Sequence, residues 1–438
     1  MDISIFGLGY VGAVSLACLA RDGHTVYGVD IDQTKLDLIA SGKPPIIEEG
    51  IQETMAEAVN SGRVHVTSDC ATAMAATELS FVCVGTPSKK NGDQDMTAIL
   101  RLTEQMGQAL RDKDGFHTVV IRSTVRPGTV LQQIEPLLEE HSGKKSGRDF
   151  GLCFQPEFLR EGTSIKDYDN PPMTIVGCNH PDSTAQLEAL FGYLPGKFIS
   201  TDVGTAECVK YACNAFHALK VTFANEIGRV SQALDVDSRK VMSLVCEDKQ
   251  LNISTAYMRP GFAFGGSCLP KDLRALLHVA RENDVEIPML AGLLPSNEQH
   301  VDLAVETVLS RKTRKIGMVG LSFKSGTDDL RESPLLTLAE RLIGKGMNIK
   351  IYDPEVNLAR IMGANKRYLE ESIPHVAELM CDTCEEVLEH GDVIVLGLGD
   401  KGIVETVRDQ VTAEHYLLDL VGLSDVDELP CEYRGACW

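Results

Sequence analysis

The sequence is poor in positive charge and contains no long apolar run. Its 42 Lys and Arg residues stand against 63 Asp and Glu residues, which gives a formal net charge of −21. This surplus of negative charge argues against nucleic acid or an anionic membrane as a partner. No apolar stretch approaches the ~20 residues that span a bilayer. Residues 1–6 carry no signal-peptide pattern. We therefore expect a cytoplasmic protein without membrane insertion.

The cysteines lack the arrangement of a disulfide framework. There are 13, an odd number, scattered through predicted strands and helices, as with Cys18, Cys83 and Cys153. This pattern is typical of buried thiols in a reducing compartment. Cys381 and Cys384 have no second such pair and no histidine at zinc-finger spacing, so they are interpreted as the entry to a helix. We expect no metal.

The chain length of 438 residues predicts two or three domains, and 43% apolar and 24% charged residues are ordinary for a globular protein. The first third alternates short apolar runs with segments of helical length, which indicates a parallel, doubly wound α/β sheet. The strands predicted there are residues 3–6, 26–30, 79–84, 119–123, 151–154 and 174–177.

A long helical pattern and a second α/β block follow. Apolar residues at helical spacing predict one helix over residues 205–234, and helical character continues to about residue 310. The later strands predicted are residues 316–320, 349–352, 393–396 and 417–420. Both blocks contain a strand, a glycine turn, a helix, and a strand that ends in aspartate, Asp30 or Asp353. We expect two Rossmann-like, doubly wound parallel-sheet domains joined by a helical segment, with substrate in the cleft between them.

A dinucleotide-binding fingerprint opens the chain. Gly7, Gly9 and Gly12 follow a predicted strand and begin a helix, and Asp30 ends the next strand. In this pattern the first glycine permits a tight turn, the second lets the backbone approach a pyrophosphate, and the third allows close packing of helix on strand. The helix N-terminus supplies amide donors. Asp30 would bind the ribose hydroxyls and repel a 2′-phosphate, so NAD is favoured over NADP.

Three loops have open interpretations. Segments 85–87 and 122–124 follow strands and suit the nicotinamide half of the cofactor, or they are ordinary turns. Glu157 and Glu161 are spaced by one turn if their segment is helical. They would then position a water or take protons, or they simply cap a helix.

Cys268 lies in a glycine-rich turn before a predicted helix. Gly265 and Gly266 precede it, and Lys271 and Asp272 follow. A thiolate is favoured by nearby cations and helix N-termini. A dehydrogenase that converts an alcohol into an acid needs a nucleophile, because the aldehyde must be captured before a second hydride can leave. The alternative is a small buried apolar residue, which the two glycines and the lysine argue against.

The long predicted helix carries a polar stripe. Lys210, Asn214 and His217 fall at i, i+4 and i+7, and Asn225 lies farther along the same side. A lysine and an asparagine directed at one oxygen would form an oxyanion hole for a tetrahedral thiohemiacetal. The alternative is a polar stripe at a domain interface.

Seven motifs together resemble the family of nucleotide-sugar 6-dehydrogenases, which includes UDP-glucose and GDP-mannose dehydrogenases. In chain order they are segments 7–12, 84–87, 122–124, 156–161, 210–225, 265–272 and 323–333. Segments 84–93, 217–226, 257–262 and 437–438 are most similar to the members that take GDP-mannose. Two positions depart from the pattern. Gln155 replaces an asparagine, and Ala256 stands where a second tyrosine occurs beside Tyr257.

The resemblance implies a four-electron oxidation of the C6 hydroxyl of a nucleotide-linked hexose to a carboxylate. Two NAD⁺ would be consumed, with a thiohemiacetal and then a thioester on Cys268. GDP-mannose giving GDP-mannuronate is the first expectation and UDP-glucose the alternative. A nucleotide-sugar sensor without turnover is the alternative of another class. A one-step hydroxyacid dehydrogenase would not explain Cys268.

The resemblance also implies three domains and an assembly. Residues 1–202 would bind NAD, residues 203–310 would form a helical centre with the catalytic cysteine, and residues 311–438 would bind the nucleotide sugar. A homodimer or higher homo-oligomer is expected, with the helical centre as its interface.

Individual roles follow from the same resemblance. Cys268 is the expected nucleophile, and Lys210 and Asn214 stabilise the oxyanion, with Lys210 also a candidate base. The residues expected to position water are Thr124, Glu161 and Asp272. The expected NAD contacts are Gly7, Gly9, Tyr10, Val11, Gly12, Asp30, Lys35, Thr86, Thr124, Lys271 and Arg331. The expected nucleotide-sugar contacts are Glu161, Lys210, Asn214, His217, Asn225, Tyr257, Arg259, Phe262, Gly265 and Lys324.

Overall fold

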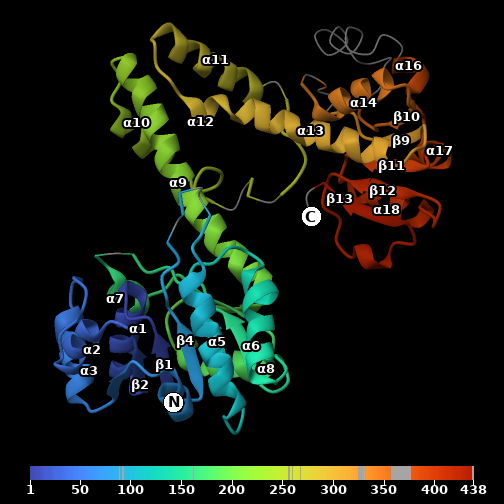
Figure 1. Ribbon diagram of the computed structural model, residues 1–438. Coiled ribbons are helices and arrows are strands. Elements are labelled where there is room, and N and C mark those ends of the chain that lie inside the picture. The colour runs from blue at the N-terminus through green and yellow to red at the C-terminus, as the bar shows by residue number, and fades with distance from the viewer. Residues whose placement is uncertain are drawn as a thin grey trace. The chain divides into compact units, whose positions relative to one another are not determined.

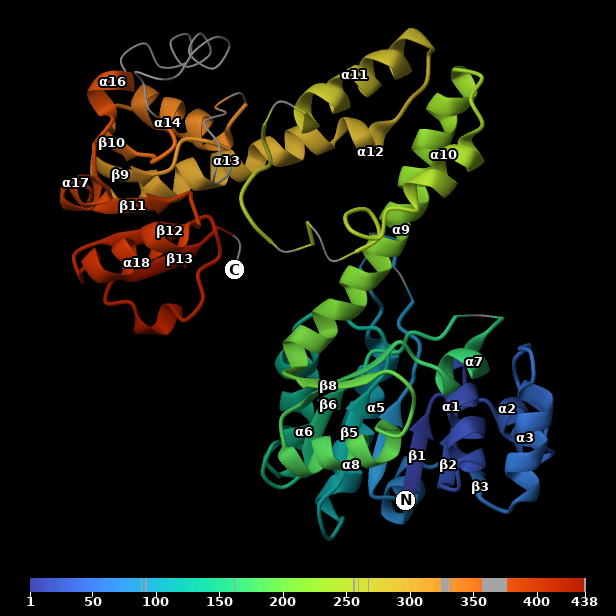
Figure 2. The same cartoon turned by 180° about the vertical axis from the view of Figure 1, so that it is seen from behind.

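The computed structural model forms two compact units, Met1–Ala218 and Leu219–Trp438 (Figures 1 and 2). It describes residues 1–87, 89–90, 93–160, 162–254, 257–258, 260–266, 268–323, 330, 332–356 and 376–436. Within these ranges, no helix combines the length and the apolar character that a membrane crossing requires.

The first unit is built on an eight-stranded sheet in the order β3-β2-β1-β4-β5-β6-β7-β8. Its strands are β1 Asp2–Phe6, β2 Thr25–Val29, β3 Val64–Thr67, β4 Leu79–Val82, β5 Thr118–Ile121, β6 Gly151–Phe154, β7 Met173–Cys178 and β8 Lys197–Thr201. Neighbouring strands are parallel except β6 and β7, which are antiparallel. The predicted doubly wound sheet is confirmed, with this one reversal that the sequence pattern did not reveal.

Helices cover both faces of the first sheet (Figure 1). They are α1 Tyr10–Arg21, α2 Gln33–Ala40, α3 Ile51–Asn60, α4 Cys70–Ala76, α5 Thr97–Arg111, the π-helix η1 Val130–Ile134, α6 Glu135–Ser142, α7 Ser164–Asp169 and α8 Pro181–Phe191. Apolar residues of α1, α2, α3 and α8 form a core on one face, and those of α4, α5 and α6 form a core on the other. The continuous apolar strands are therefore buried on both sides, as a parallel sheet requires.

The helix α9, Val203–Ala233, confirms the long helix predicted over residues 205–234. The second unit continues with α10 Ser238–Val245, α11 Leu269–Glu282, α12 Pro288–Ala291 and α13 Leu293–Ser310. Helical structure thus reaches Ser310, as the periodicity predicted.

The second unit also contains a five-stranded parallel sheet in the order β10-β9-β11-β12-β13. Its strands are β9 Lys315–Val319, β10 Asn348–Tyr352, β11 Val393–Leu396, β12 Tyr416–Asp419 and β13 Glu432–Gly435. The helices α13 and α14, Pro334–Gly344, pack on one face. On the other face lie α17, Cys384–His390, and α18, Lys401–Gln410. A short helix α16, Val376–Leu379, and a 3-10 turn η2, Val426–Glu428, complete the described elements.

The ten predicted strands are all present, and three strands were missed. The missed strands β3, β8 and β13 each lie at the edge of a sheet. Edge strands have one exposed side, so their sequences mix polar and apolar residues and give a weak signal. The interpretation of Cys384 as the entry to a helix is confirmed, because Thr383 caps the N-terminus of α17 through its side chain.

We expect Gly12→Ala to unfold the first unit at lower temperature than the wild type. A Cβ at Gly12 would overlap the carbonyl oxygen of Gly7, which is part of the rigid turn. Overpacking of this kind costs ~1–3 kcal/mol or more. Gly9→Ala is the matched control, because a Cβ at Gly9 meets no heavy atom within 4 Å. Thermal unfolding followed by circular dichroism would compare the variants. Equal midpoints for both would contradict this account.

Candidate active site

The glycine turn brings the start of α1 directly onto the sheet. Gly7 adopts φ +92°, and its amide donates to the carbonyl of Val29 over 2.8 Å. A side chain at Gly7 would come within 2.9 Å of the Val84 amide nitrogen. The open space at Gly9, by contrast, leaves room beside the backbone at the N-terminus of α1. The turn therefore fits a dinucleotide, with helix amides available to a pyrophosphate.

Asp30 is tied to this turn and to Lys35. Its carboxylate accepts hydrogen bonds from the Leu8 amide at 2.8 Å and the Asp32 amide at 3.0 Å, and the Lys35 ammonium lies 3.1 Å away. Burial alone would raise the pKa of Asp30, but the amides and Lys35 outweigh it, so the pKa lies below its ordinary value. The structure thus holds an ionised carboxylate at the end of β2, where a ribose is recognised in this fold.

The second unit repeats this arrangement. Asp353 follows β10 and accepts hydrogen bonds from the amides of Leu321 and Ser322, both at 2.8 Å. Gly320 adopts φ +110° and donates to the carbonyl of Tyr352 at 2.7 Å, as Gly7 does in the first unit. The architectural echo predicted from Asp30 and Asp353 is therefore present at the level of individual hydrogen bonds.

Thr86 and Thr124 lie together at the carboxyl ends of β4 and β5. The Thr86 hydroxyl donates to the Thr124 carbonyl at 2.6 Å, and the Gln94 amide donates to the same carbonyl at 3.0 Å. The two predicted cofactor residues are thus brought into contact. Gln94 carried no motif that would have singled it out.

Tyr10 joins the start of α1 to the loop after residue 160. Its hydroxyl donates to the Glu48 carboxylate, and the Gly162 amide donates to Glu48 at 2.8 Å. The Ser164 amide donates to the other Glu48 oxygen at 2.9 Å. Glu48 was missed by the sequence analysis, because a single glutamate in a loop gives no signal.

Lys210 is buried on α9 and pairs with Glu157. Its ammonium lies 2.9 Å from the Glu157 carboxylate and also bonds the Glu157 carbonyl. It stands 5.4 Å from the centre of the Phe158 ring. The segment 155–160 is not helical, so Glu157 caps no helix, and Glu161, the other carboxylate of the predicted pair, lies outside the described residues. Glu157 instead orients Lys210.

Asn214 and His217 are exposed on the same helix. His217 lines a cavity of about 450 Å³ together with Glu157 and Phe158. Gln155, one of the two departures from the family pattern, lines this cavity and is buried, and its side-chain oxygen has no partner among the described residues. The cavity lies wholly within the first unit, beside the polar stripe predicted on α9.

Cys268 is the N-cap residue of α11 and is exposed. Its carbonyl accepts from the Asp272 amide at 2.9 Å, and Lys271 and Asp272 form an exposed ion pair at 3.3 Å. Cys268 thus stands at the positive end of the α11 helix dipole. The interpretation of Cys268 as a buried apolar residue is therefore wrong.

The remaining predicted substrate-binding residues that the structure describes lie in the second unit. Phe262 packs against the core of that unit, Gly265 lies in the turn before Cys268, and Tyr257 is 85% exposed with φ +61°. Asn225 lines a separate cavity of about 960 Å³ on α9. Four predicted site residues lie outside the described residues: Glu161, Arg259, Lys324 and Arg331. Within the described part, no three metal-ligating side chains cluster.

The first unit has a doubly wound sheet with this glycine turn and Asp30. An exposed cysteine at a helix N-terminus follows along the chain. Together these features define an NAD-dependent dehydrogenase. Family models agree. Residues 1–194 match the NAD binding domain of the UDP-glucose/GDP-mannose dehydrogenase family, residues 204–299 its central domain, and residues 317–425 its UDP binding domain. The chain belongs to the UDP-glucose/GDP-mannose dehydrogenase family.

Individual relatives cover the whole chain. It is 51% identical to the GDP-mannose 6-dehydrogenases of Pseudomonas savastanoi pv. phaseolicola and Pseudomonas aeruginosa, with 100% of each chain covered. It is 33% identical to a UDP-glucose 6-dehydrogenase of Haloferax volcanii over 81% of this chain and 83% of the other. The crystal structure of a ternary complex of the Pseudomonas aeruginosa GDP-mannose dehydrogenase matches with a TM-score of 0.96, 51% identity and 100% of both chains covered.

We expect Asp30→Asn to remove part of the acid sensitivity of the first unit. Because folding lowers the pKa of Asp30, its ionised form stabilises the fold above about pH 4, and this contribution is lost as pH falls through the folded-state pKa. Thermal midpoints of wild type and variant should differ at pH 7 and converge toward pH 3. A difference that stays constant or widens in acid would contradict the pKa assignment.

Proposed function

We propose that the protein oxidises the C6 hydroxyl of GDP-mannose to a carboxylate, giving GDP-mannuronate. The observation that carries the chemistry is Cys268, an exposed thiol at the N-terminus of α11 in a chain that also has the dinucleotide turn. The substrate rests on 51% identity over the full length to GDP-mannose 6-dehydrogenases, against 33% to a UDP-glucose 6-dehydrogenase.

NAD⁺, when bound, accepts a hydride in each of two oxidation steps. The thiolate of Cys268 adds to the aldehyde carbon after the first step and forms a thiohemiacetal. Loss of the second hydride leaves a thioester, and water cleaves it to release the carboxylic acid and regenerate the thiol. Lys210 and Asn214 stabilise the oxyanion of each tetrahedral species. The ion pair with Glu157 directs Lys210 for this role.

The contacts proposed for the ligands follow the same scheme. Thr124, Glu161 and Asp272 position the water. The proposed NAD contacts are Gly7, Gly9, Tyr10, Val11, Gly12, Asp30, Lys35, Thr86, Thr124, Lys271 and Arg331. The proposed substrate contacts are Glu161, Lys210, Asn214, His217, Asn225, Tyr257, Arg259, Phe262, Gly265 and Lys324.

The domain roles belong to the same proposal. Residues 1–202 bind NAD, residues 203–310 form the helical centre with Cys268, and residues 311–438 bind the nucleotide sugar. The ranges matched by the three family models support this division.

A homodimer through the helical centre completes the proposal. Several large apolar side chains of α9 and α10 are exposed, among them Val221 at 61% and Leu244 at 63%. Exposed apolar residues gathered on neighbouring elements are typical of protein interfaces. A second copy of the chain is the partner that the family resemblance favours.

The central prediction is a ratio of two NADH formed per GDP-mannose consumed, with almost none formed from UDP-glucose. Cys268→Ala should reduce acid formation by roughly 10³-fold or more, because no thioester can form. Cys246→Ala, which removes another exposed cysteine of the same unit, should leave the rate unchanged. Absorbance at 340 nm and product analysis by mass spectrometry would measure both.

The outcomes separate the alternatives. A preference for UDP-glucose with the same ratio would keep the mechanism and change the substrate. Binding of NAD and sugar nucleotide without NADH would indicate a sensor. One NADH per sugar, or full activity of Cys268→Ala, would overturn the role of Cys268.

We also expect Val221→Asp to shift the protein from dimer to monomer. A carboxylate buried in an apolar interface would be left without a partner. Ile47→Asp is the control, since Ile47 is 100% exposed but lies outside the helical centre. Sedimentation velocity at matched concentrations would compare the two. A variant that stays dimeric at Val221, or a monomeric wild type, would contradict this interface.

A further inference from the structure

The segment before Cys268 is held by one side chain of α13. The Phe264 amide donates to the side-chain oxygen of Asn297 at 2.8 Å, and the Asn297 amide group donates to the Phe264 carbonyl at 2.8 Å. Both backbone polar groups of Phe264 are therefore satisfied by a single side chain. Residues 262–266 lie in neither helix nor strand, so the Phe264 backbone makes no hydrogen bonds of regular secondary structure. The two hydrogen bonds to Asn297 take their place.

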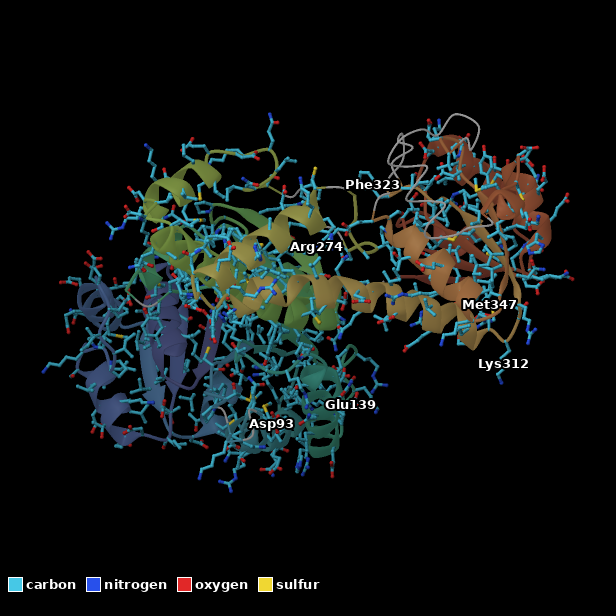
Figure 3. All side chains as sticks on the ribbon, turned by 90° about the horizontal axis from the view of Figure 1, so that it is seen from above. Asp93, Glu139, Arg274, Lys312, Phe323 and Met347 are labelled. Carbon is cyan, nitrogen blue, oxygen red and sulfur yellow. The ribbon has the colours of Figure 1, made fainter. Side chains whose placement is uncertain are left out.

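The same turn is also packed against the start of α14. A Cβ at Gly265 would overlap the Glu332 carbonyl, and one at Gly266 would stand 3.0 Å from the Phe323 ring. Arg274 of α11 forms an ion pair with Glu332. Figure 3 labels Arg274 and Phe323 among the side chains of this unit. Backbone and ring atoms thus lie close to both glycines of the turn.

The side chain of Asn297 has both a hydrogen-bond donor and an acceptor, and aspartate and leucine, which are of similar size, lack this combination. An amide presents a donor and an acceptor at once, whereas a carboxylate has acceptors only and leucine has neither. An aspartate would keep the bond from the Phe264 amide but would set a negative oxygen against the Phe264 carbonyl. A leucine of similar size would leave both groups of Phe264 unpaired. Asn297 lies on the helix α13, so the anchor itself is rigid.

We propose that Asn297 is a positioning residue for Cys268, which holds residues 264–266 in the geometry that the thiol needs to reach the aldehyde. This inference rests on the proposed role of Cys268 as nucleophile. Asn297 touches no reacting atom in this scheme and acts through the Phe264 backbone. Displacement of a reacting group by ~1 Å can cost about 10²-fold in rate.

The experiment compares Asn297→Asp and Asn297→Leu with the wild-type full-length protein. We expect kcat to fall by about 10- to 100-fold, with KM for GDP-mannose changed by less than about 3-fold. Alkylation of Cys268 by iodoacetamide is followed by mass spectrometry of its peptide. Its rate should change by about 5-fold or more, because the thiol would lie in different surroundings in the variants. All rates are measured at a temperature below the thermal midpoint of each variant.

Asn283→Asp is the matched control. Asn283 is an exposed asparagine in the same unit, and its amide donates to a backbone carbonyl, that of Val279, at 2.8 Å. It should change neither kcat nor the alkylation rate. If Asn297→Leu does not fold, Asn297→Asp still tests the idea, because it retains one of the two bonds.

Two results would overturn the inference. One is an unchanged alkylation rate and kcat in folded Asn297→Asp. The other is a lower kcat with unchanged alkylation of Cys268, since Asn297 would then act elsewhere. The alkylation measurement needs no turnover. It therefore still reports on Asn297 if Cys268→Ala shows that the proposed mechanism is wrong.

Discussion

The structure at the carboxyl edge of the first sheet depends on one close contact between backbone segments. The helix α1 lies directly against the glycine turn that precedes it. Gly12 has no side chain, so its Cα can lie against the Gly7 carbonyl, and Gly7 in turn lies against the backbone of Cys83 and Val84, just after the strand β4. The Asp30 carboxylate then holds the turn from the side through the Leu8 amide. Any larger residue at these glycines would push α1 away from the sheet, and the helix N-terminus would no longer face the cofactor.

The long helix α9 is fixed at two points by buried carboxylates. Glu207 accepts from the amides of Gly128 and Val130 at 2.7 and 3.0 Å, and Glu226 accepts from those of Met289 and Leu290 at 2.9 Å each. Burial raises the pKa of Glu207, and the two amides oppose this rise. Lys210 lies one turn beyond Glu207, so the first of these anchors also sets where the predicted oxyanion residue stands.

The sequence predicted the fold class, ten of the strands and the long helix, because burial on both faces makes parallel strands continuously apolar and a long helix keeps its period. It did not predict β3, β8 or β13, whose exposed edges blur that signal. The direction of β7 was also hidden, since an apolar run has the same composition in either orientation. The glycine turn with Asp30 and the turn around Cys268 were recognisable because each concentrates several unusual residues within a short stretch.

The sequence by itself determined which residue types stand at the candidate site: the dinucleotide glycines, the cysteine in its glycine turn, and the polar stripe of α9. Only the tertiary structure decided their partners. Lys210 meets Glu157, Tyr10 meets Glu48, and Asn297 meets Phe264. These partners lie far apart along the chain, and nothing local distinguishes them from other glutamates and asparagines. Folding brings these partners together. A buried or confined polar group needs a hydrogen bond, and the path of the backbone determines which partner lies within hydrogen-bonding distance.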